Sequence, residues 1–584
     1  MMQTKTTPVL SFEFANLQGK IKPFTFKKPI KIITTDLIEN VIPCLRHIQN
    51  EVDKGFYAAG FLSYESAPAF DSAYRVHFGN TMPLLWFGIF SEPLHETMNS
   101  TGNYSLKEWL PSVSKEEYYS SIQSIKQLIE NGETYQTNYT IRLLSNFHGD
   151  ELAFFEALKK AQSSNYCAYI HTGEHSILSA SPELFFHLKG NQLTTRPMKG
   201  TMKRGNTCSE DEANAKWLLN SEKNRAENLM IVDLLRNDLG MIAEPGSVSV
   251  PKLFDIEKYP TVHQMTSTIT AKVSPQTELV DIFKALFPCG SITGAPKIST
   301  MNTIADLETT PREIYCGAIG FISPNKEAVF NVPIRTVLID HQTSVATYGV
   351  GGGVTWDSTA EGEYDEIITK AKLLKEQRLE FKLLESLLLE KGEYFLKEYH
   401  LERLSKSANY FDFTFNREAV EKSLYMFTKQ QQNQQKMKVR LLMGKNGEIT
   451  IEGQQIEEIK TPITAILASK AVNKNNPFLY HKTTNRQIYS AFHDRKPNQA
   501  FDVLLWNEEL EITEFTNGNV VFELDNQLFT PPVQSGLLAG TFREHLINDG
   551  ILQERTIKLD DLYKYKKIWF INSVRRWLEV QLLQ

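Results

Sequence analysis

Along the first two thirds of the chain, apolar residues occur in two kinds of pattern. One is typical of β-strands and the other of α-helices. Short apolar runs between polar or turn residues predict β-strands at KIITTDL, PLLWFGIF, YQTNYTIRLL, CAYIH, SILSAS and ELFFHL. Apolar residues at three-four spacing predict a helix over 118–131, stopped by Asn131-Gly132, and a second over about 211–239 that ends at Gly240. Strands and helices mixed in this order favour a large domain of the mixed α+β (α/β) class.

A further helix and a hairpin are expected where the pattern next changes. The helix begins near Thr359, where Ser358 and Glu361 have the spacing of a capping box, and continues through AKLLKEQRLEFKLL. Beyond it, LLESLLLEKGEYFLKEYHLERL predicts a β-hairpin that turns at Lys391-Gly392 and leads into another helix.

The length of 584 residues indicates at least two domains, since one hydrophobic core rarely serves more than about 300 residues. We place the boundary at about 375–381, in the polar latter half of that helix. This division gives an N-terminal domain over 1–377, with its core at 115–375, and a C-terminal domain over 383–584. The polar run KQQQNQQK at 429–436 predicts a solvated loop or an exposed helix face.

Composition and charge exclude several classes of protein. Apolar residues make up 41% and charged residues 23% of the chain, as in ordinary globular proteins. The net charge of −6 lacks the basic excess that attaches proteins to nucleic acid or to anionic membranes. No run approaches the ~18 apolar residues of a membrane span, and MMQTKTTPVLSFEF lacks the apolar core of a signal peptide. The five cysteines are widely spaced without a CxxC pair, so we expect a reduced, cytoplasmic protein without disulfides or a zinc site.

Carboxylates on two predicted helices could supply ligands for a hard cation. Glu363, Glu366 and Lys370 are spaced i, i+3 and i+7 and share one helix face. Glu227 lies among the apolar residues of KNRAENLMIVDLLRND. Magnesium usually takes one or two protein carboxylates with water and substrate oxygens, so Glu227 with Glu366 suits a magnesium-bridged carboxylate substrate. Taken singly, each is also typical of an exposed helix charge or an ion-pair partner.

Two glycine-rich segments offer backbone N–H groups to an anion: GSITGAPK at 290–297 and YGVGGGV at 348–354. Neither has the residue pattern of a P-loop or of a GxGxxG nucleotide site. Both are also typical of tight structural turns. Three consecutive glycines before a strand permit close approach of a ligand to the backbone, and nearby Arg335 could pair with a carboxylate.

The segment SASPELFFHLKGNQLTTRPMKGTMKRG places Glu183 and Lys199 across a predicted hairpin. A lysine amine is nucleophilic only when it is neutral, and we expect neighbouring Arg196, Lys203 and Arg204 to lower the pKa of Lys199. A hydrophobic pocket that raised the pKa of Glu183 would make this carboxyl the paired general acid. The same residues are otherwise typical of a basic, solvent-facing turn.

SPE, RPMKGT, RAENLMIVDLLRNDLG, GSITGAPK, GGGV and EYDEIITKAK occur in an order and spacing that resembles the chorismate-utilising enzymes over about 115–375. This family includes anthranilate synthase component I, aminodeoxychorismate synthase component I, isochorismate synthase and salicylate synthase, all magnesium-dependent. The resemblance implies their fold, in which β-sheets pack with outer helices. It also implies a reaction that removes or relocates the 4-hydroxyl of chorismate.

Two positions favour the aminodeoxychorismate synthase component I branch of this family. Those enzymes carry PIKGT, whose lysine adds to ring carbon C2 as the hydroxyl leaves, whereas anthranilate synthases carry alanine there. This chain reads PMKGT, with Lys199 in place and Met198 for isoleucine. Isochorismate and salicylate synthases have a water-activating lysine where this chain has Gln136, and glutamine cannot serve as that base.

The resemblance also implies roles for individual residues. Glu183 would be the general acid for the departing hydroxyl and Lys199 the transient nucleophile, which ammonia then displaces. No glutaminase motif such as GxCxG is visible, so we expect ammonia from a glutamine amidotransferase subunit or from solution. The implied magnesium ligands are Glu227, Glu363 and Glu366, and the implied substrate-binding residues are His263, Thr293, Gly294, Tyr315, Arg335, Gly351, Gly352, Gly353 and Lys370.

The C-terminal domain has three features that pyridoxal 5′-phosphate (PLP) needs: a lysine for the Schiff base, an acid for the pyridine nitrogen and a phosphate site. Lys482 in YHKTTNRQIY and Glu514 in EITEFTNGNV would be the lysine and the acid. Arg403 in HLERL, with Gly540 and Thr541 in GLLAGTFRE, would form the phosphate site. Each residue alone is also typical of a surface charge or a turn.

Together, HLERL, HKTTNR, ITEFTNGN and GLLAGTFRE resemble the fold-type IV PLP enzymes over about 383–584. This group includes branched-chain and D-amino acid aminotransferases and aminodeoxychorismate lyase. The domain is shorter than a free-standing lyase. A homodimer formed through it is a further expectation.

We therefore expect a bifunctional cytoplasmic enzyme that converts chorismate and ammonia to 4-amino-4-deoxychorismate and then eliminates pyruvate to give 4-aminobenzoate for folate synthesis. The fusion of two consecutive steps supports this hypothesis by analogy. Alternatives stay open for each half. The N-terminal half could be an anthranilate synthase component, and the C-terminal half could be a D- or branched-chain amino acid aminotransferase or a non-catalytic docking domain.

Overall fold

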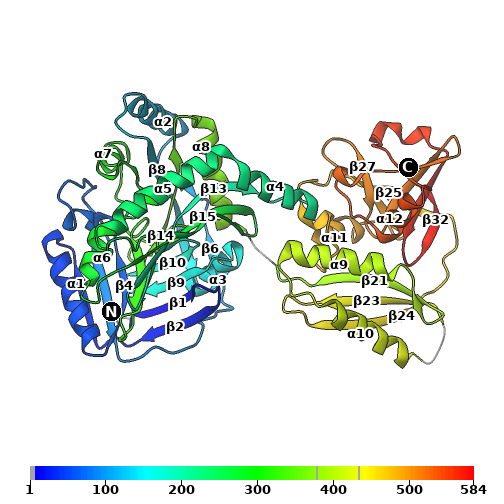
Figure 1. Ribbon diagram of the computed structural model, residues 1–584. Coiled ribbons are helices and arrows are strands. Elements are labelled where there is room, and N and C mark those ends of the chain that lie inside the picture. Colours follow the sequence, from blue (N-terminus) through cyan, green and yellow to red (C-terminus); the bar gives the residue numbers. More distant parts are fainter. Residues whose placement is uncertain (1–6, 377–378, 432–434, 584) are drawn as a thin grey trace. The chain divides into compact units, whose positions relative to one another are not determined.

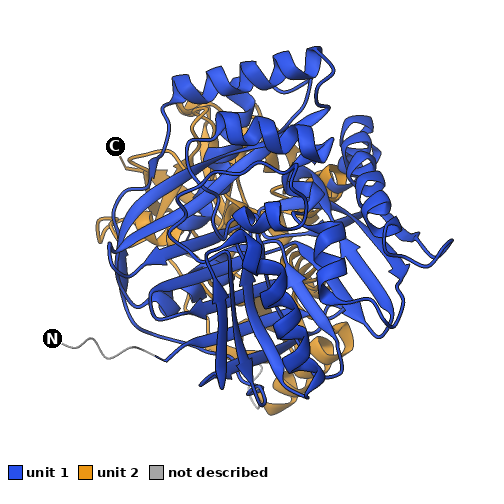
Figure 2. Ribbon diagram, turned by 90° about the vertical axis from the view of Figure 1, so that its left-hand side faces the viewer, with its two compact units in different colours: residues 1–203, 215–378 blue, residues 204–214, 379–584 orange. Residues whose placement is uncertain are grey.

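The structure is a computed structural model that describes residues 7–376, 379–431 and 435–583. It divides into two compact units, each with its own sheets and core (Figure 1, Figure 2). Unit 1 comprises residues 1–203 and 215–378, and unit 2 comprises residues 204–214 and 379–584. The segment 204–214 therefore belongs to unit 2, although both of its flanks in the sequence belong to unit 1.

Unit 1 contains two ten-stranded sheets. The first runs in the order β16 (Gly294–Ala295), β8 (Gln136–Gly149), β20 (Val345–Val354), β19 (Thr336–Asp340), β10 (His175–Ser181), β9 (Tyr166–His171), β1 (Val9–Ala15) and β2 (Ile21–Lys27), with β6 (Tyr104–Leu106) and β7 (Leu110–Pro111) paired to β8. The second runs β13 (Met198–Lys203), β15 (Val262–Lys272), β12 (Gln192–Arg196), β11 (Leu184–Lys189), β18 (Ala328–Asn331), β17 (Ala318–Ile322), β4 (Tyr57–Leu62), β5 (Leu85–Phe90) and β3 (Lys31–Thr35), with β14 (Ser249–Lys258) paired to β15.

An aromatic core joins the two sheets of unit 1. Phe12 and Phe26 of the first sheet pack against Phe321 of the second, with ring centroids 5.4 and 6.2 Å apart. Helices pack against both sheets. They are α2 (Lys115–Glu130), α3 (Glu151–Gln162), α7 (Lys297–Leu307) and α8 (Ala360–Ala371) for the first sheet, and α1 (Ile38–Asp53) and α5 (Glu222–Gly240), with α6 (Leu279–Leu286) beside them, for the second.

The strands predicted in unit 1 are confirmed, and so is the helix predicted over 118–131. That helix, α2, starts earlier than predicted because Ser114 and Glu117 form a reciprocal capping box. The helix predicted over 211–239 is instead two helices, α4 (Cys208–Asn220) and α5. The break comes at Ser221, whose side chain accepts a hydrogen bond from Asn224 N and caps α5.

The helix expected near Thr359 is confirmed as α8, but its predicted cap is wrong. Thr359 is the N-cap, and its hydroxyl accepts a hydrogen bond from Gly362 N. The neighbouring Ser358 hydroxyl donates instead to Glu363. The helix also ends earlier than predicted, at Ala371, and a short 3₁₀ turn follows it.

Unit 2 contains two sheets. The four-stranded sheet, β22 (Glu393–Tyr394), β21 (Leu383–Glu390), β23 (Met437–Met443) and β24 (Ile449–Gln455), packs against α9 (Lys397–Phe411) and α10 (Arg417–Gln430). The eight-stranded sheet runs β27 (Ile512–Phe515), β26 (Asp502–Trp506), β25 (Ile463–Leu467), β32 (Arg576–Leu582), β31 (Lys567–Asn572), β28 (Asn519–Leu524), β29 (Gln527–Thr530) and β30 (Gln553–Glu554), with α11 (Gln487–His493) against β26 and α12 (Thr541–Asn548) against β31.

The hairpin predicted at the start of unit 2 is confirmed. Lys391 and Gly392 turn it with φ angles of 52° and 81°, which glycine adopts freely and lysine rarely. Within the predicted polar run, α10 ends at Gln430, and residues 432–434 lie outside the described residues. The mixed α/β class is confirmed for the protein. None of the helices in the described ranges is both long and apolar enough to cross a membrane.

Candidate active sites

Lys199 lies on β13, and its amine reaches the glycines of β20. A Cβ atom added to Gly353 would lie 2.9 Å from Lys199 Nζ and 2.1 Å from Gln136 Nε2, so only glycine leaves room for both side chains. Burial lowers the pKa of Lys199, the charge of Glu227 opposes this effect, and the charge of Lys370 adds to it. The amine is therefore closer to its neutral, nucleophilic form than that of an exposed lysine.

The basic neighbours expected to lower the pKa of Lys199 are engaged elsewhere. Arg196 pairs with Glu257, and Arg204 pairs with Asp211 in unit 2. The predicted direction of the shift is confirmed, but its predicted cause is wrong. Desolvation produces the shift, and the assisting cation comes from helix α8.

Glu183 is buried just before β11. Burial raises the pKa of Glu183 to about 7, while a hydrogen bond from Ser291 and the charge of Lys199 act in the opposite direction. The Ser291 hydroxyl donates to Glu183 Oε1 at 2.5 Å. A carboxyl with a pKa near neutrality can hold a proton at physiological pH, as a general acid must.

The run Gly351, Gly352 and Gly353 is part of strand β20, not the turn expected before a strand. The three glycines pair with residues 138–140 of β8. Successive residues of a strand face opposite sides, so the absent side chains leave space toward Gln136 on one side and toward α8 on the other. Both polar atoms of the Gln136 amide are buried without a hydrogen-bond partner. Such groups are rare in native proteins, and they fit a site that receives a ligand.

Three carboxylates in this region, Glu227, Glu363 and Glu366, lie close enough for their charges to act on one another. A Cβ atom on Gly352 would lie 2.7 Å from Glu363 Oε2 and 3.4 Å from Glu366 Oε1. Glu363 Oε2 is buried without a hydrogen-bond partner, and burial raises the pKa of Glu363. Burial also raises the pKa of Glu227, and the charge of Glu366 adds to this rise. Carboxylates that repel one another, one of them with a buried oxygen that no donor reaches, suit a cation that keeps water and substrate oxygens as its other ligands.

Lys370 connects α8 to the glycine strand. Its amine donates to Gly351 O at 2.7 Å and pairs with Glu366 Oε1 at 2.5 Å. This pairing outweighs burial and lowers the pKa of Glu366. Arg335 Nη1 donates to Lys370 O at 2.9 Å. The structure thus brings together Arg335, Lys370, the glycines and the carboxylates of α8.

Of the other predicted substrate residues, Gly294 and His263 lie on strands, whereas Thr293 and Tyr315 lie in turns. Gly294, which follows Thr293, pairs with Thr137 of β8, and a Cβ atom there would lie 2.0 Å from Gln136 O. His263 is buried on β15, in register with Met202 of β13. The ring of Tyr315 packs against Gly349 of β20, two residues before the glycine run. It lines a cavity of about 350 Å³ together with Arg142.

The second candidate site is in unit 2 and centres on Lys482. Burial, together with the charges of Arg403 and Arg486, lowers the pKa of Lys482 to about 7, against the opposing charges of Glu385 and Glu514. An amine with a pKa near 7 is neutral in a large fraction of molecules at physiological pH. This state is the one that attacks an aldehyde.

Glu514 is buried on β27, and the charge of Lys482 acts to lower its pKa. Its Oε1 accepts hydrogen bonds from Tyr489 Oη at 2.8 Å and from Leu538 N at 3.2 Å, and its Oε2 accepts one from Asn519 Nδ2 at 3.3 Å. Burial nevertheless raises the pKa of Glu514 to about 7. A cationic pyridine nitrogen would supply the charge partner that this carboxylate lacks, so the acid fits PLP.

Arg403 on α9 is held by a bidentate pair with Glu385, at 2.9 and 2.6 Å, and donates from Nη1 to Ala539 O at 3.1 Å. The arginine thus lies beside the turn of Gly540 and Thr541, which begins α12. A Cβ atom on Gly540 would lie 1.9 Å from Asn519 Oδ1, so a larger residue there would displace the Asn519 side chain that also donates to Glu514. Guanidinium N–H groups and a helix N-terminus beside the buried lysine fit a phosphate group.

Several supporting residues were missed from the sequence. Ser291 lies inside GSITGAPK, so its motif was noticed but not its hydroxyl. Asn228, next to Glu227, donates to Lys199 O at 3.2 Å. In unit 2, Glu385 lies in an apolar run that predicts only a strand, and Tyr489 lies seven residues after Lys482. The functional partners of these four residues are distant in sequence, so no local spacing could have indicated them.

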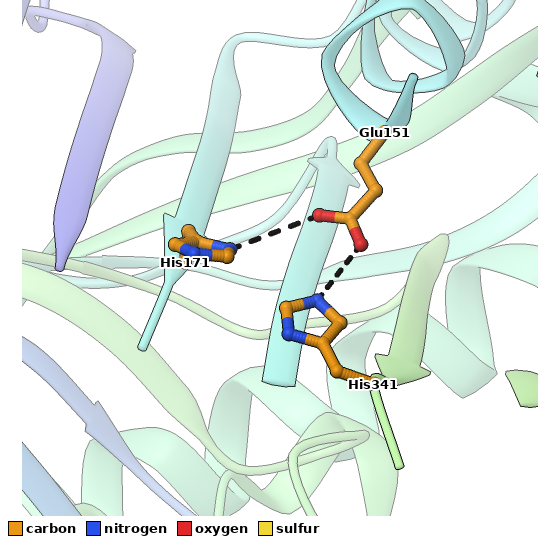
Figure 3. A group of neighbouring side chains, drawn as sticks. All are labelled: Glu151, His171 and His341. Carbon is orange, nitrogen blue, oxygen red and sulfur yellow. Dashed lines mark ion pairs between the residues drawn. The ribbon is translucent and has the colours of Figure 1, made fainter. Parts of the chain in front are cut away.

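A separate cluster in unit 1 joins Glu151, His171 and His341 (Figure 3). His341 Nε2 lies 2.8 Å from Glu151 Oε1, and its Nδ1 lies 3.1 Å from Gly173 O. Both neighbours are acceptors, so they favour the doubly protonated ring, and the hydrogen bond to Glu151 raises the pKa of His341. Among the described residues, this is the only group of three His, Cys, Asp or Glu whose potential ligand atoms lie within 4.8 Å of one another. Its mutual hydrogen bonds already account for the arrangement.

Comparisons with known proteins match two successive parts of the chain to two different families. Residues 16–376 match the family model described as chorismate binding enzyme, and residues 382–583 match the one described as amino-transferase class IV. Aminodeoxychorismate synthase component 1 of Salmonella typhimurium is 41% identical over 267 residues, which are 45% of this chain and 57% of that protein. The chain thus spans a little over half the length of that relative.

Two further proteins resemble unit 1. Anthranilate synthase component 1 of Methanothermobacter marburgensis is 34% identical over 340 residues, which are 54% of this chain and 73% of that protein. The crystal structure of anthranilate synthase component I from Streptococcus pneumoniae aligns with a TM-score of 0.50 and 24% identity, and covers 64% of this chain and 94% of that one. This structural likeness shows the fold alone.

Proposed function

The chain belongs to the chorismate-binding enzymes, and from this premise we propose that unit 1 converts chorismate and ammonia to 4-amino-4-deoxychorismate and that unit 2 releases pyruvate to give 4-aminobenzoate. One observation carries the proposal. A lysine amine with a lowered pKa lies beside the glycine strand of unit 1, and its charge acts on a buried carboxyl whose pKa is about 7. This pair suits the replacement of a hydroxyl through a lysine adduct.

In unit 1, Lys199 Nζ forms a bond to C2 of the chorismate ring, both ring double bonds shift by one position toward C4, and the C4–O bond breaks. Glu183 gives its proton to the departing oxygen, which leaves as water. Ammonia then bonds to C4, both double bonds shift back, and the electron pair of the C2–N bond returns to Lys199. The proton that the new amine loses restores protonated Glu183. Gln136 contacts the same space but has no basic group, so it disfavours addition of water in place of ammonia.

Magnesium is the cation that we propose for Glu227, Glu363 and Glu366. When bound, it would neutralise a substrate carboxylate beside three protein carboxylates. Arg335 and Lys370 keep α8 against the glycine strand, so the two acids of that helix stay beside Gly352. Lys370 also keeps Glu366 ionised, as a metal ligand must be.

The match to class IV aminotransferases implies PLP for unit 2. We propose that Lys482 holds its aldehyde, Glu514 its ring nitrogen, and Arg403 with Gly540 and Thr541 its phosphate. When bound, PLP supplies an electron sink for removal of a proton from the amino-bearing carbon. Lys482 accepts that proton and returns one to the leaving pyruvate. An amine with a pKa of about 7 can both take up and release a proton near neutral pH.

Ammonia must reach unit 1 from outside this chain. We propose a glutamine amidotransferase subunit as its source, because the relatives named component 1 imply a second component. Use of the product for folate synthesis, a cytoplasmic location and a homodimer through unit 2 remain parts of the proposal.

The test incubates the purified protein with chorismate, ammonium, magnesium and PLP and identifies the products by mass spectrometry. We expect 4-aminobenzoate and pyruvate in equal amounts. Accumulation of 4-amino-4-deoxychorismate would retain the first step and overturn the second, and unit 2 would then be an aminotransferase or a docking domain. Formation of anthranilate would overturn the role given to Lys199.

A further inference from the structure

We propose that residues 204–214 are a positioning element of unit 2 that fixes His481 and, through it, Lys482. In the sequence this segment lies between Lys199 and Glu227 of unit 1, yet its packing partners lie in the C-terminal part of the chain. The link to PLP chemistry rests on the proposed function of unit 2. The contacts themselves do not depend on it.

The segment is built around a buried ion pair. Arg204 Nε and Nη2 donate to the two carboxylate oxygens of Asp211 at 2.6 and 2.7 Å, and both side chains are more than nine-tenths buried. Gly205 N also donates to Asp211 Oδ1, at 2.9 Å. A Cβ atom on Gly205 would lie 2.2 Å from Asp211 N, so only glycine permits this fold of the chain. The segment is thus a preformed, rigid loop.

Tyr410 of α9 carries the contact from this loop to the rest of unit 2. Its hydroxyl donates to Gly205 O at 2.7 Å, and its carbonyl accepts a hydrogen bond from Arg204 Nη2 at 2.9 Å. The Arg204 guanidinium lies over the tyrosine ring, 4.6 Å from its centroid. Three contacts to one residue fix both the backbone and the ring of Tyr410.

The ring of Tyr410 also packs against His481, the residue before Lys482. The rings of Tyr410 and His481 are stacked with centroids 4.2 Å apart, and His481 Nδ1 lies 3.0 Å from Ser407 Oγ. Burial, with the charge of Arg204, lowers the pKa of His481 to about 4, so the ring is neutral and adds no charge beside Lys482. Its position is therefore set by the stacked ring of Tyr410, by the Phe411 ring, whose centroid lies 4.9 Å away, and by hydrogen bonding.

The chain around Lys482 is held on its opposite side by β21. Leu384 N donates to Lys482 O at 3.0 Å, and Thr484 N donates to Lys382 O at 2.9 Å. Residues 481–484 are thus held between a strand and the Tyr410 network. If the network loosened, this stretch would be fixed along one edge only, and water would reach the Lys482 amine.

Gly205→Ala in the full-length protein tests the proposal, because the added methyl group collides with Asp211 N inside the loop. Gly240→Ala is the matched control, since a Cβ atom on Gly240 meets nothing within 4 Å. Two readouts are measured: hydrogen exchange at residues 382–384 and 481–484 without cofactor, and the dissociation constant and pH midpoint of covalent PLP attachment. We expect Gly205→Ala to speed exchange, to weaken PLP binding about tenfold and to move the midpoint to higher pH, with no change in the control.

Tyr410→Phe provides a milder second variant in case Gly205→Ala does not fold. It removes only the hydroxyl bond to Gly205 O and keeps the ring on His481, so we expect changes in the same direction but smaller. Wild-type exchange rates and an unchanged PLP midpoint in the folded variants would overturn the proposal. If the wild-type protein attached no PLP, the proposed function of unit 2 would fail, and hydrogen exchange alone would decide the positioning role.

Discussion

The Ser291 hydroxyl donates a 2.5 Å hydrogen bond to Glu183 Oε1 inside unit 1. Both side chains are buried, and the bond favours the ionised form of a carboxyl whose pKa burial raises to about 7. The two opposing effects leave Glu183 near the pH at which it can both hold and release a proton. Ser291 thus adjusts the proposed general acid without contacting the bond that breaks.

Replacing Ser291 by alanine should raise the pKa of Glu183 further, because burial then acts without this donor. The alkaline limb of the pH profile of kcat/KM for aminodeoxychorismate formation is expected to move up by about one pH unit. Ser299→Ala is the control, since that hydroxyl donates to Glu133 O instead. An alkaline limb at the wild-type pH in Ser291→Ala would separate Glu183 from the observed ionisation.

Lys199→Ala should remove the proposed nucleophile without unfolding unit 1, because the smaller side chain leaves the pairing of β13 with β15 unchanged. We expect formation of 4-amino-4-deoxychorismate to fall at least about 100-fold, with any remaining product shifted toward anthranilate. Lys203→Ala, an exposed lysine on the same strand, is expected to keep its activity. Mass spectrometry of the chorismate products measures both variants, and normal aminodeoxychorismate formation by Lys199→Ala would refute the assignment.

The parts of the fold that could be predicted from sequence are those fixed by neighbours along the chain. Strands at CAYIH and SILSAS follow from short apolar runs, and the hairpin at Lys391-Gly392 follows from turn chemistry. The helix predicted over 211–239 is confirmed except for its continuity, because Ser221 caps α5 although its sequence context is typical of a helix interior. Propensity alone does not distinguish these two roles of serine.

The candidate sites show the same limit. Motif spacing indicates Glu183, Lys199 and Lys482. It does not indicate what lowers the pKa of Lys199, nor that residues 204–214 belong to unit 2. The glycines of β20 were read as a turn because glycine is typical of turns. In the structure, their role is to leave space for side chains on other elements, which is a property of tertiary packing that a single sequence does not express.

Arg486 is expected to set the pH at which Lys482 reacts with PLP. The amine attacks only when neutral, so attachment should rise with pH through a midpoint near 7 in the wild-type protein, well below the ordinary value for lysine. The positive charge of Arg486 contributes to this lowered pKa. Arg486→Met should therefore move the midpoint to higher pH.

The midpoint is measured from the absorbance of covalently attached PLP after short incubations across the pH range. Lys436→Ala serves as the control, because this exposed lysine pairs with Glu390 on the sheet surface. A midpoint near the ordinary lysine pKa in the wild-type protein would show that Lys482 is not the desolvated amine seen in the structure.

The Glu151 cluster should make the stability of unit 1 depend on pH. Burial opposes ionisation of Glu151, but hydrogen bonds from His171, His341 and Ser176 outweigh it and lower its pKa to about 2. A carboxyl with a folded-state pKa below its unfolded value stabilises fully above the unfolded value, about 4.3, and loses this contribution as pH falls toward 2. The Glu151 bond raises the pKa of His341, so the histidine contribution is full below about 6.5 and declines as pH rises through the raised value.

Glu151→Gln should therefore destabilise unit 1 by about 3 kcal/mol between these limits and by much less near pH 2. Urea unfolding followed by tryptophan fluorescence at pH 2.5, 5.5 and 9 measures the difference. Glu133→Gln, which changes an exposed carboxylate, is expected to match the wild-type protein at every pH. An equal loss of stability in Glu151→Gln at pH 2.5 and 5.5 would mean that packing of the side chain, rather than its charge, supports the cluster.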